Sequence, residues 1–481
     1  MLALFPKERP EYGAPDVAGF SAVSRLFYGD VYAQVVTVIR RDGTESRGVS
    51  RVGREKLNGK LETDRHLQRI IKQSFYKSAM CFIETPPVWG SLTGIRPARV
   101  AAAALNSGKS EESAAKYLVD KYHVSPERAD LCISAAQSAL CVIKSLDPAD
   151  IALYVGIPFC PSRCAYCSFV SNSVEKSFGS VEPFVRQLLC EIAAVAEVVC
   201  LLGLRIAAVY IGGGTPTAIP DKSFEDILRA LWSSFDLTGI REFTVEAGRP
   251  DTITSSKLEI MSRYGVGRVC VNPQSMSNDV LRMIGRKHTA EDTIAAANLV
   301  RQNGFSLNMD VIAGLPGDTP EGFRNTLDTV LGMEPENITV HTLSLKKGSR
   351  ITLDEVEHLS GRSDSSVQMN PGGAEVSLML DYAFARLREQ GFLPYYLYRQ
   401  KFTSGGFENT GWFLPGHAGI YNICMMEELC SVFSLGGGAV TKLVSPDGRI
   451  ERIFNAKYPR EYLLQTEKIA GKIEKIKRFY D

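Results

Sequence analysis

The stretch IALYVGIPFCPSRCAYC, residues 151–167, decides the fold prediction because it joins an apolar strand to three closely spaced cysteines. Its first seven residues are a short run rich in β-branched side chains, which is typical of a buried strand. Cys160, Cys164 and Cys167 follow in the loop with the spacing Cys-x3-Cys-x2-Cys. Thiolates are soft ligands that bind iron–sulfur clusters, zinc or Cu(I), so the loop predicts a metal or cluster site.

The number of cysteines separates these alternatives. A [4Fe–4S] cluster normally takes four thiolates, so three cysteines would leave one iron open to an outside ligand. A structural zinc site needs a fourth protein ligand. The next cysteine, Cys190, falls in a predicted helix. The loop therefore favours an iron–sulfur cluster over zinc and over chance clustering.

Beyond this loop, short apolar strands alternate with amphipathic helices. Further strands are predicted at 206–213, 242–248, 267–274, 307–317 and 338–345. The helices between them are predicted near 180–201, 221–235, 254–264, 277–303 and 319–333. Such alternation indicates a parallel sheet, and six strands fit either an open barrel or a doubly wound sheet. Polar and glycine-rich residues follow the strands, at the edge where sites form in both architectures.

The chain divides by pattern into three predicted domains: 1–148, 149–345 and 346–481. The first is expected to be a small α+β or mainly helical accessory domain, with a strand at 31–41 and helices at 62–82, 110–124 and 125–146. The last is expected to contain a helix near 373–390 and a helical C-terminus. Its stretch 395–422 is rich in glycine and aromatic residues, so we expect a loop there.

Composition limits the function classes. The 481 residues are 44% hydrophobic and 23% charged, the balance of a soluble globular protein. A formal net charge of +1 gives no overall field that would recruit nucleic acid or an anionic membrane. We expect no signal peptide and no membrane span, and therefore a cytoplasmic location. Eleven cysteines without an export signal do not predict a disulfide framework.

Other candidate site residues lie at or after strand ends. In IGGGTPT (211–217), glycines let the backbone approach a ligand and free N–H groups can bind a carboxylate, although a tight turn would also explain them. Glu246 ends the third strand, where a carboxylate could accept hydrogen bonds; a surface ion pair is its alternative role. Asp310 lies among apolar residues, where a polar side chain needs a partner, and a structural hydrogen bond is its alternative role.

The CPSRCAYC loop, with GGGTP after the next strand, resembles the radical S-adenosylmethionine superfamily. The resemblance implies an α/β fold: a partial (β/α)6 barrel with an N-terminal accessory α+β domain and a C-terminal α+β extension. It also implies two cofactors, a [4Fe–4S] cluster on Cys160, Cys164 and Cys167, and S-adenosylmethionine on the open iron. An electron from the reduced cluster then cleaves the C–S bond, yielding methionine and a 5′-deoxyadenosyl radical that abstracts hydrogen from the substrate.

The resemblance also assigns residues around the cofactor. Gly212, Gly213, Gly214 and Thr215 are expected to contact the methionine moiety. Tyr154 is expected near S-adenosylmethionine, Tyr166 beside the adenine and Glu246 at the ribose diol. Gln274, Arg286 and Asp310 fit further cofactor-binding positions of the subfamily.

Within the superfamily the chain is similar to the oxygen-independent coproporphyrinogen III oxidases, in the coproporphyrinogen dehydrogenase branch with an extra N-terminal segment. The matching segments are SLTGIRPARV (91–100), YYLYRQK (395–401), FENTGW (407–412), PGHAGIYN (415–422) and SLGGGAVTK (434–442). The implied reaction converts two propionates of coproporphyrinogen III to the vinyls of protoporphyrinogen IX, in heme biosynthesis. Candidate carboxylate clamps are Arg399, Lys401 and Arg163. A tetrapyrrole substrate, an electron donor such as flavodoxin or ferredoxin, and a monomeric state are expected.

One departure from the oxidase pattern keeps two other functions open. The established oxidases carry a fourth cysteine two residues after the triplet, where this chain has Phe169, as the heme-chaperone relatives do. Those chaperones also carry a His-Asn pair followed by Tyr-Trp, where this chain reads Tyr421-Asn422-Ile423-Cys424-Met425-Met426. The hypotheses are therefore a radical decarboxylase, a heme-binding chaperone, and a radical enzyme with an unrelated substrate.

Overall fold

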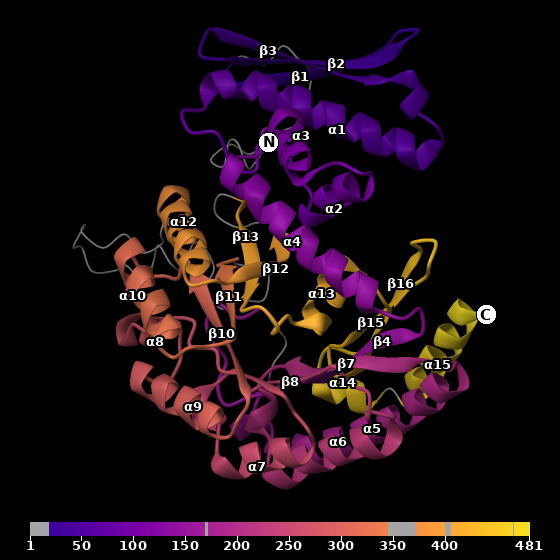
Figure 1. Cartoon of the computed structure of the whole chain (residues 1–481), viewed down its shortest axis with the longest axis vertical. Coiled ribbons are helices and arrows are strands. Elements are labelled where there is room, and N and C mark those ends of the chain that lie inside the picture. Colours follow the sequence, from indigo (N-terminus) through magenta and orange to yellow (C-terminus); the bar gives the residue numbers. More distant parts are fainter. Residues whose placement is uncertain (1–18, 169–171, 345–371, 400–405, 465) are drawn as a thin grey trace. The chain divides into compact units, whose positions relative to one another are not determined.

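The computed structural model describes residues 19–168, 172–344, 372–399, 406–464 and 466–481 (Figure 1). Two compact units are distinguished, an N-terminal unit of residues 1–133 and a C-terminal unit of residues 134–481. The division falls within helix α4 (Pro126–Ser145). The boundaries at 148 and 345 that the sequence suggests stay predictions. No helix in the described parts of the chain is long and apolar enough to cross a membrane.

The N-terminal unit is an α+β structure, as predicted. Strands β1 (Ser21–Tyr28), β2 (Tyr32–Arg41) and β3 (Thr44–Gly53) form an antiparallel sheet, and α1 (Lys60–Ala79) packs on it. The close approach depends on Gly48, since a Cβ there would lie 2.0 Å from the Ser74 carbonyl oxygen of α1. Helices α2 (Ala98–Asn106) and α3 (Glu111–Tyr122) follow. Only the middle strand was predicted from the sequence, because β1 and β3 contain few buried apolar side chains and so lack a clear hydrophobic pattern.

The C-terminal unit contains an eleven-stranded sheet whose centre is six parallel strands. These are β4 (Asp150–Ile157), β7 (Arg205–Gly213), β8 (Glu242–Glu246), β9 (Arg268–Cys270), β10 (Ser306–Ala313) and β11 (Asn337–Thr342). Each pairs in parallel with the next along the chain. A doubly wound sheet would reverse its strand order part-way. The order found here is that of an open (β/α) barrel, so the barrel prediction is confirmed.

Helices connect these strands along the outer side of the sheet (Figure 1). They are α5 (Val174–Leu201), α6 (Asp221–Ser234), α7 (Ser255–Arg263), α8 (Asn278–Met283), α9 (Ala290–Gln302) and α10 (Pro320–Leu331). The single helix expected at 277–303 is wrong. Gly285 takes a φ of +74°, which ends the first helix, and Thr289 starts the second with a capping box to Asp292.

Further strands extend both edges of the parallel core. Strands β13 (Glu408–Phe413) and β12 (Leu393–Arg399) follow β11 in antiparallel pairing. On the other edge β14 (Val432–Gly436) pairs in parallel with β4, followed by β15 (Val440–Val444) and β16 (Ile450–Phe454). The loop expected at 395–422 is therefore wrong for β12, β13 and the start of α13 (Ile420–Glu427). Gly411 lies in a strand, where a Cβ would be 2.1 Å from the Tyr396 ring.

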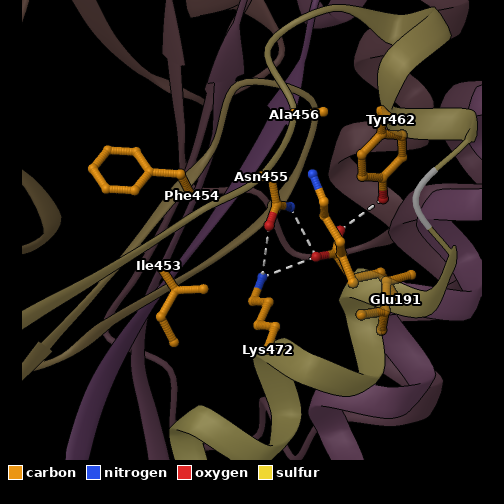
Figure 2. Close-up of a pocket in the computed structure, with 9 residues that line it drawn as sticks. Glu191, Ile453, Phe454, Asn455, Ala456, Tyr462 and Lys472 are labelled. Atoms are coloured by element: carbon orange, nitrogen blue, oxygen red, sulfur yellow. Dashed lines mark hydrogen bonds and ion pairs between the residues drawn. The ribbon is translucent and has the colours of Figure 1, made fainter.

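The last helices are fixed to the barrel by one buried carboxylate (Figure 2). Glu191 of α5 accepts hydrogen bonds from Lys472 Nζ at 2.9 Å, Tyr462 Oη at 2.7 Å, Asn455 Nδ2 at 2.8 Å and the Gly436 N–H at 2.8 Å. Burial raises the pKa of Glu191, but Lys472 and the hydrogen bonds outweigh it and hold the pKa below its ordinary value. This network joins α14 (Pro459–Leu463) and α15 (Thr466–Tyr480) to α5 and β14. Helix α12 (Gly373–Glu389) packs on α10.

Candidate functional site

The cysteine loop leaves the carboxyl end of β4 through the two-residue strand β5 (Phe159–Cys160), which pairs with β6 (Asn172–Ser173). The Thr215 N–H donates to the Phe159 carbonyl at 2.7 Å, and the Thr215 hydroxyl donates to Cys160 Sγ at 3.5 Å. Further along, the Ala165 N–H donates to the Ile284 carbonyl at 3.0 Å. Neighbouring elements therefore hold the loop at two points, with Cys164 buried and the other two cysteines partly exposed.

The three thiols are not arranged around a single metal ion. Within the described ranges, no group of three or more His, Cys, Asp and Glu side chains could hold one metal ion. In a [4Fe–4S] cluster each thiolate binds a different iron, so the sulfurs need not meet at one point. Three thiols within eight residues match three corners of such a cluster.

The glycine segment lies directly beside the cysteine loop. A Cβ on Gly214 would lie 2.5 Å from the Phe159 carbonyl oxygen, and Gly213 has a φ of +112°, which side-chain-bearing residues rarely adopt. A Cβ on Gly212 would lie 2.8 Å from Glu246 Oε2. Close backbone approach therefore explains all three glycines, and it brings the end of β7 against both the cysteine loop and Glu246.

Glu246, at the end of β8, lies near Asp310, in the middle of β10. The Tyr210 hydroxyl donates to Glu246 Oε1 at 2.6 Å. Burial raises the pKa of Glu246 to about 7, with the nearby Asp310 carboxylate adding to the effect and the Tyr210 hydrogen bond opposing it. Asp310 accepts from Asn308 Nδ2 at 3.1 Å and lies 3.6 Å from His341 Nε2. Glu246 is thus bonded to a buried hydroxyl rather than to a surface cation, whereas Asp310 has the structural hydrogen bond considered from the sequence.

Gln274 and Arg286 are buried and carry polar atoms with no partner among the described residues. Gln274 has a φ of +69°, and its backbone N–H donates to the Asp310 carbonyl at 3.0 Å while its Oε1 is unpartnered. Arg286 donates to the backbone carbonyl of Asn272 and, at 3.5 Å, to the Tyr166 hydroxyl, but its Nε is unpartnered. Buried polar groups normally have partners, so the two atoms leave hydrogen-bonding capacity unused among the described residues.

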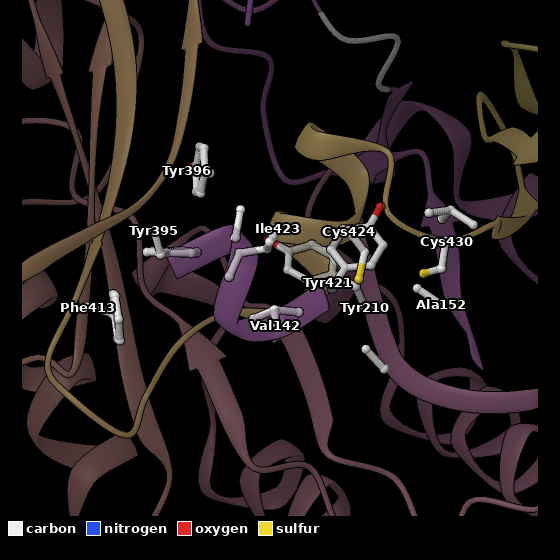
Figure 3. Packing of buried hydrophobic residues seen from close by; sticks show 13 residues of the cluster. Val142, Ala152, Tyr210, Tyr395, Tyr396, Phe413, Tyr421, Ile423, Cys424 and Cys430 are labelled. Carbon is white, nitrogen blue, oxygen red and sulfur yellow. The ribbon is translucent and has the colours of Figure 1, made fainter. Parts of the chain in front are cut away.

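Tyr210 and Tyr421, which the sequence did not assign to the cofactor site, pack beside Glu246 and Tyr154 (Figure 3). Tyr210 stacks on Tyr421 at 4.4 Å between ring centroids, and Tyr154 stacks on Tyr421 at 6.0 Å and on Tyr210 at 6.4 Å. Tyr154 and Tyr210 are register partners on β4 and β7. The alternation of strand side chains was the available signal for Tyr210, because it lies two residues before Gly212 on the same face.

The remaining candidates are more scattered. Tyr166 packs against Ile284 and its apolar neighbours on α8 and β10. Arg399 donates to the Gly406 carbonyl at 2.9 and 3.0 Å. Arg163 lies in the cysteine loop. Lys401 and Phe169 lie outside the described residues.

Comparison with known proteins identifies the family of the chain. A family model described as the Radical SAM superfamily matches residues 154–330. A Bacillus subtilis (strain 168) protein named oxygen-independent coproporphyrinogen-III oxidase-like protein HemZ is 40% identical over 380 residues, which cover 78% of this chain and 74% of that protein. The chain belongs to the radical SAM family of oxygen-independent coproporphyrinogen oxidases.

Two further relatives are more distant. The heme chaperone HemW of Escherichia coli (strain K12) is 26% identical over 319 residues, covering 65% of this chain and 75% of that protein. The solved structure of coproporphyrinogen III oxidase (HemN) from Escherichia coli, described as a radical SAM enzyme, superposes with a TM-score of 0.51. It is 20% identical and covers 69% of this chain and 72% of that one, so it supports the fold.

Proposed function

We propose that the protein is a radical S-adenosylmethionine enzyme that converts coproporphyrinogen III to protoporphyrinogen IX by oxidative decarboxylation without O2. The observation that carries the proposal is that the carboxyl ends of β4, β7 and β8 lie together, with the cysteine loop following β4. Thr215, after β7, is bonded to the cysteine loop, and Gly212 lies against Glu246 of β8. The 40% identity to a coproporphyrinogen-III oxidase-like protein supports the tetrapyrrole substrate class.

The residues present fit the cofactors of this chemistry. Cys160, Cys164 and Cys167 would hold three irons of a [4Fe–4S] cluster and leave the fourth iron for S-adenosylmethionine. The segment Gly212–Thr215 would face its methionine carboxylate and amine. The other cofactor-binding candidates are Tyr154, Tyr166, Glu246, Gln274, Arg286 and Asp310. When bound, the two cofactors supply a 5′-deoxyadenosyl radical that abstracts a hydrogen from the propionate side chain.

The chain itself would orient the nucleoside and exclude water. Glu246 must be ionised to accept hydrogen bonds from both ribose hydroxyls, and the Tyr210 hydroxyl fixes its Oε1 at 2.6 Å. The stacked rings of Tyr154, Tyr210 and Tyr421 form an apolar wall beside this carboxyl group. Such a wall limits water near a reactive radical.

Tyr421 favours the decarboxylase over the heme chaperone. It occupies the position where the chaperone pattern has histidine, and only 5% of its surface is exposed because it packs in the tyrosine stack. Asn422 is bonded to the Tyr395 hydroxyl at 3.3 Å. This segment therefore supports packing of the barrel interior rather than an open heme ligand.

The same resemblance implies the location, the oligomeric state and the electron donor of the proposed enzyme. We expect a cytoplasmic monomer that binds a small tetrapyrrole and receives electrons from a carrier such as flavodoxin or ferredoxin.

Anaerobic incubation of the reconstituted, reduced protein with S-adenosylmethionine and coproporphyrinogen III tests the proposal. We expect protoporphyrinogen IX and two CO2 per substrate, measured by chromatography of the oxidised porphyrins and by trapped label from carboxyl-labelled substrate. Absence of turnover together with stoichiometric heme binding would instead identify a chaperone. Absence of both, with continued S-adenosylmethionine cleavage, would point to another substrate.

A further inference from the structure

The turn of residues 249–252, just after β8, contains a buried charged residue that nothing above explains. The turn includes the 3-10 turn Pro250–Thr252. Arg249 is only 2% exposed. Burying a guanidinium is costly unless it is paired and hydrogen-bonded. Asp251 supplies that pairing, with Nε–Oδ1 at 3.0 Å and Nη2–Oδ2 at 3.1 Å.

The third nitrogen of Arg249 binds the cysteine loop. Nη1 donates to the Ser162 hydroxyl at 3.0 Å and to the Ser162 carbonyl at 3.5 Å. Ser162 lies midway between Cys160 and Cys164. The two-pronged pair with Asp251 fixes the guanidinium plane, and this fixed plane in turn fixes the position of the loop.

The other end of the same turn binds the glycine segment. The Thr252 hydroxyl donates to the Arg249 carbonyl at 2.8 Å. It also lies 2.6 Å from the Thr217 hydroxyl. Since the Thr252 proton is already used, the Thr217 hydroxyl donates to Thr252. Thr217 is two residues beyond Thr215, which is bonded to Cys160.

We propose that Arg249 is a positioning residue for the cluster: its turn connects the cysteine loop to the glycine segment and fixes their spacing. The inference rests on the proposed function only in taking Cys160, Cys164 and Cys167 as the cluster ligands. Arg249 and Thr252 act through Ser162 and Thr217, which lie two residues along the chain from groups that would touch the cofactors. Partners of this kind commonly affect metal affinity or activity by about 10- to 100-fold.

The test compares the two ends of β8. Arg249→Met removes the contact with Ser162, and Arg249→Lys keeps the charge but not the two-pronged geometry. Arg241→Met is the matched control, because Arg241 pairs with buried Asp150 at 3.1 Å at the opposite end of the sheet. The readouts are iron released to a chelator, the electron paramagnetic resonance spectrum of the reduced cluster, and KM and kcat for S-adenosylmethionine cleavage.

We expect Arg249→Met to lose iron to the chelator about 10- to 100-fold faster, with an altered spectrum and a raised KM, and Arg249→Lys to be intermediate. Arg241→Met should have a lower melting temperature but the iron retention and spectrum of the unsubstituted protein. If Arg249→Met loses only thermal stability, as Arg241→Met does, the proposal is wrong.

A milder variant covers the case in which Arg249→Met does not fold. Thr252→Val is nearly isosteric and breaks only the bonds to Thr217 and the Arg249 carbonyl. It should also speed iron loss, and unchanged iron loss would overturn the proposal. None of these readouts uses a tetrapyrrole, so a failed decarboxylation assay would bear on the substrate and not on Arg249. An unsubstituted chain that assembles no cluster would overturn the cluster assignment and this inference together.

Discussion

Glu246 lies at the end of β8 in surroundings that favour its neutral form. Burial is the largest cause, and it raises the pKa of the carboxyl from 4.5 to about 7. Tyr210 and a neighbouring backbone N–H compensate in part. At neutral pH the side chain is therefore close to the midpoint of its titration, so a ligand with two hydroxyl groups would draw it into the ionised form.

This raised pKa predicts how the apoprotein's stability depends on pH. A carboxyl whose pKa is higher in the folded state stabilises the fold fully below its unfolded value of 4.5 and loses that contribution as pH rises through about 7. Relative to Glu246→Gln, which does not titrate, the free energy of unfolding should fall by up to about 3 kcal/mol across this window. Urea unfolding at several pH values measures it. Parallel profiles for the two proteins would contradict the assignment.

The sequence indicated several candidate residues but not their partners, and it did not indicate Tyr210 or Arg249. Strand ends and motifs indicated Glu246 and the glycine segment, and a polar side chain among apolar neighbours indicated Asp310. The partner of Glu246 is 36 residues away and that of Arg249 is 87 residues away. Nothing local in the sequence specifies such pairs, because they depend on which strands become neighbours.

At the scale of elements, α15 is fixed by a buried ion pair rather than by packing alone. Lys472 and Glu191 are 3% and 1% exposed, and each also bonds to a backbone or side-chain partner. Removing one member of such a pair leaves an uncompensated charge in the interior.

Lys472→Met should therefore lower the free energy of unfolding by about 3–5 kcal/mol. The control is Lys477→Met on the same helix, whose partner Glu474 is 74% exposed. An exposed pair of this kind contributes only about 0–1 kcal/mol. Chemical denaturation of both variants measures the difference, and equal effects would show that the buried pair is not what fixes α15.

Elements were predictable where periodicity was strong. The six core strands alternate with helices, and their order follows from parallel connections between neighbours. The outer strands of the sheet were not predictable. For example, β14 pairs with β4 although about 280 residues of chain separate the paired positions, Val432 and Ala152. In β12 and β13, aromatic and glycine residues suggested a loop, but the glycine makes room for a ring in the adjacent strand.

On the scale of the whole molecule, the two units have separate apolar interiors. Ile70, fully buried in α1, packs with Ala33, Val35 and Val52 in the N-terminal unit. Ile227, fully buried in α6, belongs to the C-terminal unit. Units with their own cores can open separately while the rest of the chain stays folded.

Ile70→Ala and Ile227→Ala should therefore act locally. Each should destabilise its own unit by about 2–5 kcal/mol, because truncation leaves a cavity. Hydrogen exchange of the intact protein, read peptide by peptide, should show faster exchange in β2 and α1 for Ile70→Ala and in β7 and α6 for Ile227→Ala. Equal acceleration in both units by either substitution would indicate one cooperative structure.

The central claim is that the loop of Cys160, Cys164 and Cys167 holds the cluster that cleaves S-adenosylmethionine. Its most direct test is the formation of 5′-deoxyadenosine by the reconstituted, reduced full-length protein. The account predicts formation by the unsubstituted protein, none by Cys164→Ala, and normal formation by Cys132→Ala, which truncates a buried cysteine of α4. Normal 5′-deoxyadenosine formation by Cys164→Ala would contradict it.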